Sequence, residues 1–96
     1  MAAVGLLTLH LQLPHSHSLK DKRKVLQALK DRLRRRSNVS VAEIEFQEKW
    51  QRSVVGVVAI SQAEAHAREV LERVEQEAAR LLGSDLTSSE IEFLLA

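Results

Sequence analysis

The spacing of hydrophobic residues switches repeatedly between two periods along this chain, and that succession constrains the fold more than any other feature. The two-residue alternation or unbroken apolar run that is typical of strands occurs in residues 4–13, 39–49, 54–61 and 90–95. Leucine, valine and alanine instead recur three or four positions apart, as in an amphipathic helix, in residues 19–36 and 63–82. The predicted order of elements is therefore β-α-β-β-α-β within 96 residues.

That order predicts a single α+β domain of the ferredoxin-like class over residues 1–96. Right-handed crossovers place both helices on one face of a four-stranded antiparallel sheet. We expect Ser18 with Asp21, and Ser61 with Glu64, to cap the two helices, and Gly83 to end the second. Because this fold carries many unrelated functions, it does not by itself indicate one.

The composition argues against several kinds of chemistry. The chain has no cysteine, which excludes disulfides and thiolate sites. No serine, histidine and acidic residues have the spacing of a nucleophile with its base, so we expect a non-enzymatic protein without catalytic residues or cofactors. His10, His15 and His17 lie close in sequence, but further ligands are missing nearby, and we interpret them as solvated side chains without a metal. No segment has the length of an apolar membrane span, and we expect a cytoplasmic protein.

Charge is distributed unevenly along the chain. Residues 15–36 contain nine basic and two acidic residues, whereas the rest of the chain contains five basic and eleven acidic ones. The first predicted helix is thus strongly basic and the second is acidic. Three interpretations remain open: a face that binds a polyanion, a solvated surface, and pairing between the two helices.

Two residues stand out from this pattern. On a helical wheel, Lys22 falls inside the apolar stripe of the first helix. We interpret it as a lysine that extends past the sheet edge to a ligand; the alternative is a structural lysine paired with a partly buried acid. Trp50, near the tip of the predicted hairpin, either completes the core or contacts a partner.

The sheet face opposite the helices is predicted to be apolar. The aromatic residues of the chain are Phe46, Trp50 and Phe93, and none of them lies on the two central strands. Readout of single-stranded RNA by stacking on the sheet is therefore not expected. An uncovered apolar face predicts a cover, most simply a second copy of the chain, and hence a homodimer.

Four blocks of sequence form a recognisable pattern in a fixed order: residues 16–23 (SHSLKDKR), 38–43 (NVSVAE), 50–52 (WQR) and 56–57 (GV). This pattern resembles the YlxP-like family of small bacterial proteins of unknown function, and residues 91–93 resemble its closing strand. The resemblance implies a ferredoxin-like fold and a bacterial cytosolic protein. Members are often encoded beside translation-initiation and ribosome-maturation factors, which implies an association with RNA or the ribosome. The family supplies no catalytic residues.

Together these features favour a non-enzymatic binding protein that associates with RNA or the ribosome. The alternatives are a dimeric module that binds a small molecule or has a regulatory role, and a protein–protein adaptor. The candidate nucleic-acid-binding residues are Lys20, Lys22, Arg23, Lys24, Lys30, Arg34, Arg35, Arg36, Trp50, Gln51 and Arg52. The arginines of the second helix, Arg68, Arg73 and Arg80, are not expected to contribute.

Overall fold

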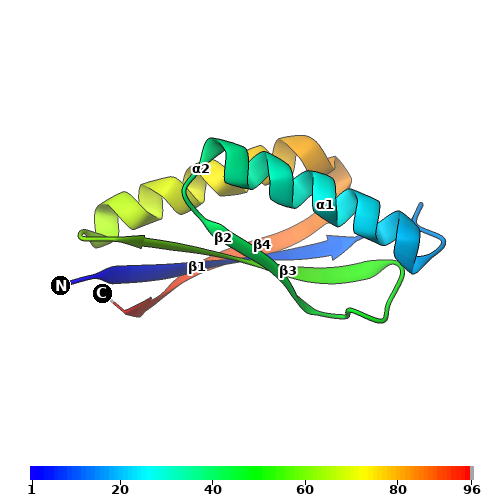
Figure 1. Cartoon of the computed structure of the whole chain (residues 1–96), viewed down its shortest axis with the longest axis horizontal. Helices are drawn as coiled ribbons and strands as arrows, with labels where there is room; N and C mark the ends of the chain where they lie inside the picture. Colours follow the sequence, from blue (N-terminus) through cyan, green and yellow to red (C-terminus); the bar gives the residue numbers. More distant parts are fainter. Residues whose placement is uncertain (96) are drawn as a thin grey trace.

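The computed structural model describes residues 1–95 and contains one four-stranded sheet and two long helices (Figure 1). The elements are β1 (Ala3–Gln12), α1 (Leu19–Arg36), β2 (Ser40–Glu45), β3 (Arg52–Ser61), α2 (Glu64–Leu82), the short 3-10 helix η1 (Gly83–Asp85) and β4 (Leu86–Leu95). This is the predicted order of strands and helices. In residues 1–95, no helix combines the length and the apolar character that crossing a membrane requires.

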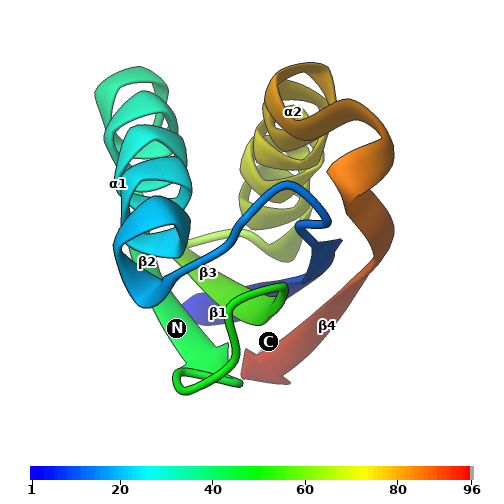
Figure 2. The same cartoon turned by 90° about the vertical axis from the view of Figure 1, so that its right-hand side faces the viewer.

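The strands pair antiparallel in the order β2-β3-β1-β4. Both helices lie side by side on one face of the sheet, and no helix or strand of residues 1–95 covers the other face (Figure 2). The first and last strands of the chain are neighbours, with Val4 opposite Leu95, so the two ends of the chain lie at the same end of the sheet (Figure 1). This is the ferredoxin-like arrangement that the sequence predicts.

The core lies between the sheet and the helices. Alternate residues of a strand point to opposite faces, which turns one set of β1 and β3 side chains toward the helices. Burial of each large aliphatic side chain contributes about 1.5–3 kcal/mol. The fully buried large side chains of this layer are Leu7, Leu9, Val55, Val57, Leu29, Leu33, Leu71 and Val74.

The ends of the helices agree with the predicted caps at α1 but not at the start of α2. The Ser18 hydroxyl accepts a hydrogen bond from the Asp21 amide at 3.0 Å, as expected for an N-cap. The cap predicted from Ser61 and Glu64 is wrong, because α2 begins two residues later than that pairing requires, with Ala63 as N-cap. The Ser61 hydroxyl instead accepts the Ala63 amide at 3.4 Å, within the turn before the helix.

The second strand is shorter than predicted, ending at Glu45 rather than at residue 49. Its register to β3 shifts between Glu43 and Glu45, and Phe46 has a positive φ of 65°, a backbone conformation that takes it out of the extended strand. The Phe46 carbonyl is turned toward the Lys22 ammonium, which donates to it at 2.6 Å. A contact with α1, invisible to strand periodicity, thus ends β2 early.

Candidate functional site

Six basic side chains of α1 point away from both the core and α2, and we call this surface the outer basic face. Lys20, Lys24 and Arg35 lie opposite the buried stripe of the helix, and Lys30 is half-buried along its flank. Arg34 reaches the sheet edge, where its guanidinium donates to the Val41 carbonyl of β2 at 3.2 Å. The outer basic face comprises Lys20, Arg23, Lys24, Lys30, Arg34 and Arg35.

The positive charge of this face is not neutralised by nearby acidic side chains of the described residues. Among residues 1–95, no carboxylate lies within 4.0 Å of a charged nitrogen of the outer basic face. The two acids of α1 are engaged elsewhere: Asp21 accepts the His17 amide at 3.0 Å, and Asp31 accepts the Gln27 side chain at 2.9 Å. The interpretation that the two helices neutralise each other by pairing therefore does not extend to this face.

Lys22 is the candidate residue whose surroundings differ most from the expectation. Its side chain is only 2% exposed, and its ammonium lies 2.8 Å from the Glu43 carboxylate. The same ammonium donates to backbone carbonyls of the β2–β3 loop, those of Phe46 (2.6 Å), Lys49 (2.6 Å) and Arg52 (3.1 Å). Because its donors are used inside the protein, Lys22 does not reach the surface, and it is a structural lysine paired with a partly buried acid.

The three candidate residues of the hairpin lie in different surroundings. Trp50 is 54% exposed and does not belong to the core. The Gln51 amide donates to the carbonyls of Pro14 (3.2 Å) and Ser16 (3.0 Å), which ties the hairpin to the β1–α1 loop. The Arg52 guanidinium stacks over the Phe46 ring, 4.1 Å from its centroid. All three residues are exposed, but the side chains of Gln51 and Arg52 are engaged in these contacts within the protein.

Much of the sequence pattern that resembles the YlxP-like family is therefore explained by local structure. Ser18 caps α1, Lys22 holds the β2–β3 loop, and Gln51 joins that loop to the β1–α1 loop. These three polar residues act within the fold. The exposed side chains that remain from the same blocks include Lys20, Arg23 and Trp50.

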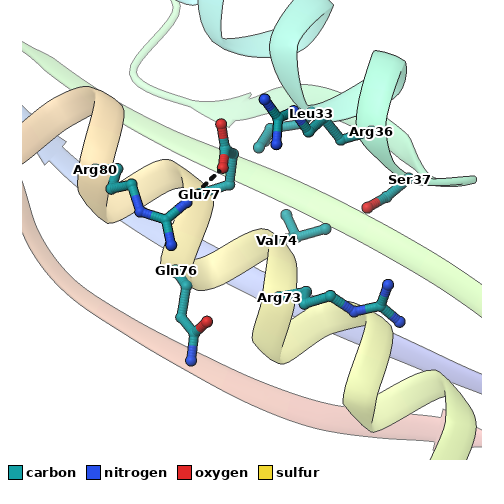
Figure 3. A pocket seen from close by; sticks show the side chains of 8 residues that line it. All are labelled: Leu33, Arg36, Ser37, Arg73, Val74, Gln76, Glu77 and Arg80. Atoms are coloured by element: carbon teal, nitrogen blue, oxygen red, sulfur yellow. Dashed lines mark hydrogen bonds and ion pairs between the residues drawn. The ribbon is translucent and has the colours of Figure 1, made fainter.

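A second basic region lies in a groove between the two helices, which we call the interhelical groove. It has a volume of about 360 Å³ and is lined by Leu33, Arg36 and Ser37 at the end of α1 and by Arg73, Val74, Gln76, Glu77 and Arg80 of α2 (Figure 3). Arg73 and Arg80, which are not expected to contribute to RNA binding, line this groove together with Arg36 of α1. Their seven-residue spacing, which places both on one face of α2, is the signal that could have located them.

Glu77 forms one wall of the interhelical groove and is 7% exposed. Its two carboxylate oxygens accept hydrogen bonds from Arg32 at 2.7 Å and from Arg80 at 3.1 Å. The hydrogen bond from Arg32, together with the positive charges of Arg36, Arg32 and Arg80, holds the pKa of Glu77 below its usual value despite the opposing effect of burial. Glu77 is therefore ionised at neutral pH, and the Arg32–Glu77 ion pair supports, for these two residues, the interpretation in which the helices pair.

The histidines do not form a metal cluster. Among residues 1–95, no three histidine, cysteine or acidic side chains come together in a way that could hold a metal ion. His10 lies on the uncovered face of the sheet, where its ring nitrogen is 2.9 Å from the Glu90 carboxylate of β4.

Comparison with known proteins identifies the family. Residues 4–91 match the family model described as "Protein of unknown function (DUF503)". The chain belongs to this family. The uncharacterized protein YlxP of Bacillus subtilis (strain 168) is 40% identical over 57 residues, which are 59% of this chain and 62% of that relative's length. The resemblance to the YlxP-like family is thereby confirmed, although the aligned part is less than two thirds of that relative.

Solved structures with low sequence identity share the fold. The designed protein Foldit4 has a TM-score of 0.62 at 14% identity, over 100% of this chain and 99% of that one. SnoaB, a cofactor-independent oxygenase from Streptomyces nogalater, has a TM-score of 0.56 at 15% identity, over 100% and 94%. A dimeric ferredoxin-like protein of unknown function from Thermobifida fusca YX has a TM-score of 0.50 at 12% identity, over 97% and 92%. At these identities the likeness establishes the ferredoxin-like fold alone.

Proposed function

We propose that this protein is a non-enzymatic RNA-binding protein that associates with the ribosome through the outer basic face of α1. The observation that carries the proposal is that six basic side chains gather on one helix face without a carboxylate within 4.0 Å in the described chain. The net charge of the whole protein is only +1. At physiological salt, however, screening acts over about 8–10 Å, so an approaching phosphate responds mainly to the local charge.

Contacts to phosphate rather than to bases are expected to supply most of the affinity. The uncovered sheet face has no aromatic residue on its central strands, so it lacks a stacking platform. Trp50 offers one exposed ring on the β2–β3 loop, which lies near the first turns of α1 (Figure 1). Stacking on such a ring contributes about 1–3 kcal/mol per base and tolerates any sequence. The proposal therefore predicts RNA binding with little sequence preference.

Copurification tests the proposed function. The tagged protein, isolated at low salt without nuclease, is expected to carry RNA, detected as a raised ratio of absorbance at 260 nm to that at 280 nm and as ribosomal RNA on a gel. The triple variant K20Q/R23Q/K24Q is expected to lose most of this RNA, whereas the charge-preserving variant K20R/R23K/K24R retains it. These three residues are exposed, so neither variant should alter the melting temperature. Wild-type protein free of RNA, or equal loss in both variants, contradicts the proposal.

A second candidate function, a dimeric binding or regulatory module, is favoured by the uncovered face of the sheet. Its exposed apolar side chains include Ile44 (46% exposed), Ile60 (67%) and Leu95 (52%). Three strands of ten residues and one of six, with a rise of about 3.3 Å per residue and a spacing of about 4.8 Å, give a flat area of roughly 570 Å². That area is of the order of the ~800 Å² per partner that stable complexes bury, and we propose a second copy as the occupant. The related fold from Thermobifida fusca is described as dimeric.

Light scattering tests the dimer. Twice the chain mass of 10.8 kDa is expected at micromolar concentration, and Ile60→Lys is expected to give the monomer mass, because the lysine would be desolvated between the two sheets. Leu81→Lys, at a comparably exposed apolar position on α2, serves as the control and should remain dimeric. A monomer mass for the wild type across a wide dilution series rules the dimer out.

A further inference from the structure

The interhelical groove has the size and the lining of a small-ligand site. Its volume of about 360 Å³ lies within the range of roughly 300–1,000 Å³ that is usual for ligand pockets. Arg36 comes from the end of α1 and lies near Glu77, whereas Arg73 and Arg80 come from α2, with Arg80 directed toward Glu77 and Arg73 extending along the helix (Figure 3). The buried Leu33 and Val74 form its apolar part. Residues of both helices therefore line one hollow between them.

The charge of this region favours an anion. Glu77 faces the groove, but each of its oxygens already accepts an arginine nitrogen. Arg73 lies 3.7 Å from Glu69 in an exposed pair that is worth little in water. With Arg32 included, four guanidiniums face two carboxylates, which leaves two net positive charges.

Arg36 is the group best placed to bind a ligand. In the described chain, its guanidinium has no carboxylate within 4.0 Å, although its charge helps to keep Glu77 ionised. The neighbouring Ser37 and Gln76 add a hydroxyl and an amide as neutral donors. The last carbonyls of α1 carry partial negative charge, which a cation at this end offsets. Arginine presents a planar fork of N–H groups that matches two oxygens of a phosphate.

We propose that the interhelical groove binds a phosphate group through Arg36 and Arg73, while the Arg80–Glu77–Arg32 pairs hold its wall. The phosphate belongs either to a small phosphorylated molecule or to the end of an RNA chain. This inference goes beyond the proposed function, because Arg36 lies on the flank of α1 that faces α2 and the outer basic face lies on the opposite flank. The groove can bind phosphate whether or not the outer basic face binds RNA.

Titration with inorganic phosphate and pyrophosphate, followed by calorimetry and by the NMR signals of the arginine side chains, tests the inference. Pyrophosphate is expected to bind and to shift the Arg36 and Arg73 signals. In R36Q/R73Q its dissociation constant should rise at least about tenfold. The control K49Q/R68Q removes the same charge outside both the groove and the outer basic face, and should change the constant less than about twofold.

Specific outcomes overturn the inference. Equal weakening in R36Q/R73Q and K49Q/R68Q would mean that only the general charge of the protein attracts the anion. Absence of binding at millimolar pyrophosphate would mean that the groove is not a phosphate site. Because both positions of the groove variant are exposed, melting temperatures close to that of the wild type are expected; if R36Q/R73Q does not fold, R36Q and R73Q are titrated singly.

RNA oligonucleotides with a 5′-phosphate or a 5′-hydroxyl distinguish the two sources of the phosphate. Preference for the phosphorylated RNA in the wild type, lost in R36Q/R73Q, identifies an RNA end. Equal binding of the two RNAs, with pyrophosphate binding retained, identifies a free phosphorylated molecule. Failure of both RNAs to bind would contradict the proposed function of the outer basic face but would leave the pyrophosphate result standing, so the two proposals fail separately.

Discussion

At the scale of single residues, the Lys22 ammonium is surrounded by backbone carbonyl oxygens, to which it donates hydrogen bonds. It connects α1 to the β2–β3 loop and to Glu43, whose carboxylate also accepts the Ser53 hydroxyl at 2.6 Å. Helical spacing predicts that Lys22 falls in the apolar stripe. It does not predict the destination of the ammonium, because the acceptors lie 24 to 30 residues further along the chain. The sequence alone thus favours a binding lysine and leaves a structural lysine as the alternative, which the buried contacts support.

Lys22→Met is expected to destabilise the protein by about 3 kcal/mol, because it leaves the Glu43 carboxylate partly buried without a counter-charge and several carbonyls without donors. Urea unfolding at neutral pH measures the loss. The exposed Lys24→Met should stay within about 0.5 kcal/mol of the wild type. The double variant K22M/E43L should recover part of the stability, since it removes the unpaired carboxylate. A K22M protein as stable as the wild type would show that the contacts of Lys22 are not structural.

Glu77 gives a prediction about pH. Its pKa is held below the ordinary 4.5, chiefly by the hydrogen bond from Arg32, so the unfolded chain takes up a proton before the folded protein does. The stabilisation from its ion pairs is therefore complete well above pH 4.5 and is lost as the pH falls through the folded-state pKa. Glu77→Gln should lower the urea midpoint at about pH 7 and lower it less at about pH 3. A difference between the two proteins that does not change with pH would contradict this role.

At the scale of elements, Gly5 lies where β1 packs directly against the Leu71 side chain of α2. A Cβ atom on Gly5 would lie 2.7 Å from Leu71 Cδ1 and 3.1 Å from the ring of Phe93. Gly56, on the uncovered face, has no such restriction, since the nearest atoms to its Cβ position, in Ile44, are 3.4 Å away. The separation between helix and sheet thus depends on one glycine and not on the other.

Gly5→Ala is expected to cost about 1–3 kcal/mol, because the new methyl group overpacks the fully buried Leu71 side chain. Gly56→Ala should change the stability less than Gly5→Ala, because it makes ordinary contacts. Thermal unfolding of the two variants beside the wild type measures the difference. Equal melting temperatures for the two variants would show that α2 can move away from β1 at little cost.

Hydrophobic periodicity predicts an element well where one of its faces is buried. It predicts the element poorly where a tertiary contact determines where the element begins or ends. The β1 alternation and the α1 and α2 stripes are strong, and the structure confirms these elements. The end of β2 depends on the Phe46 carbonyl turning to Lys22, and the start of α2 does not use the Ser61 cap; neither is visible in local spacing. The interhelical groove could be predicted only in part, because the sequence does not specify how α1 and α2 pack side by side.

At the scale of the whole molecule, the basic residues of α1 separate into three environments. Lys22 is buried beneath the hairpin, Arg32 and Arg36 face α2, and the outer basic face turns to solvent. The sequence shows a single basic block, and only the fold divides it. This division is the reason why a protein with a net charge of +1 can present a concentrated positive surface on one side.

The measurement that tests the central claim most directly is the salt dependence of binding to a single-stranded RNA of mixed sequence, followed by fluorescence anisotropy. If all six bases of the outer basic face contact phosphates, the logarithm of the binding constant should fall with that of the salt concentration with a slope of about −4. K20Q/R23Q/K24Q, with three of those contacts removed, should give a slope of about −2, whereas K20R/R23K/K24R should keep the wild-type slope. Absence of binding at low salt, or a slope that the triple variant leaves unchanged, would contradict the claim that α1 binds RNA through this face.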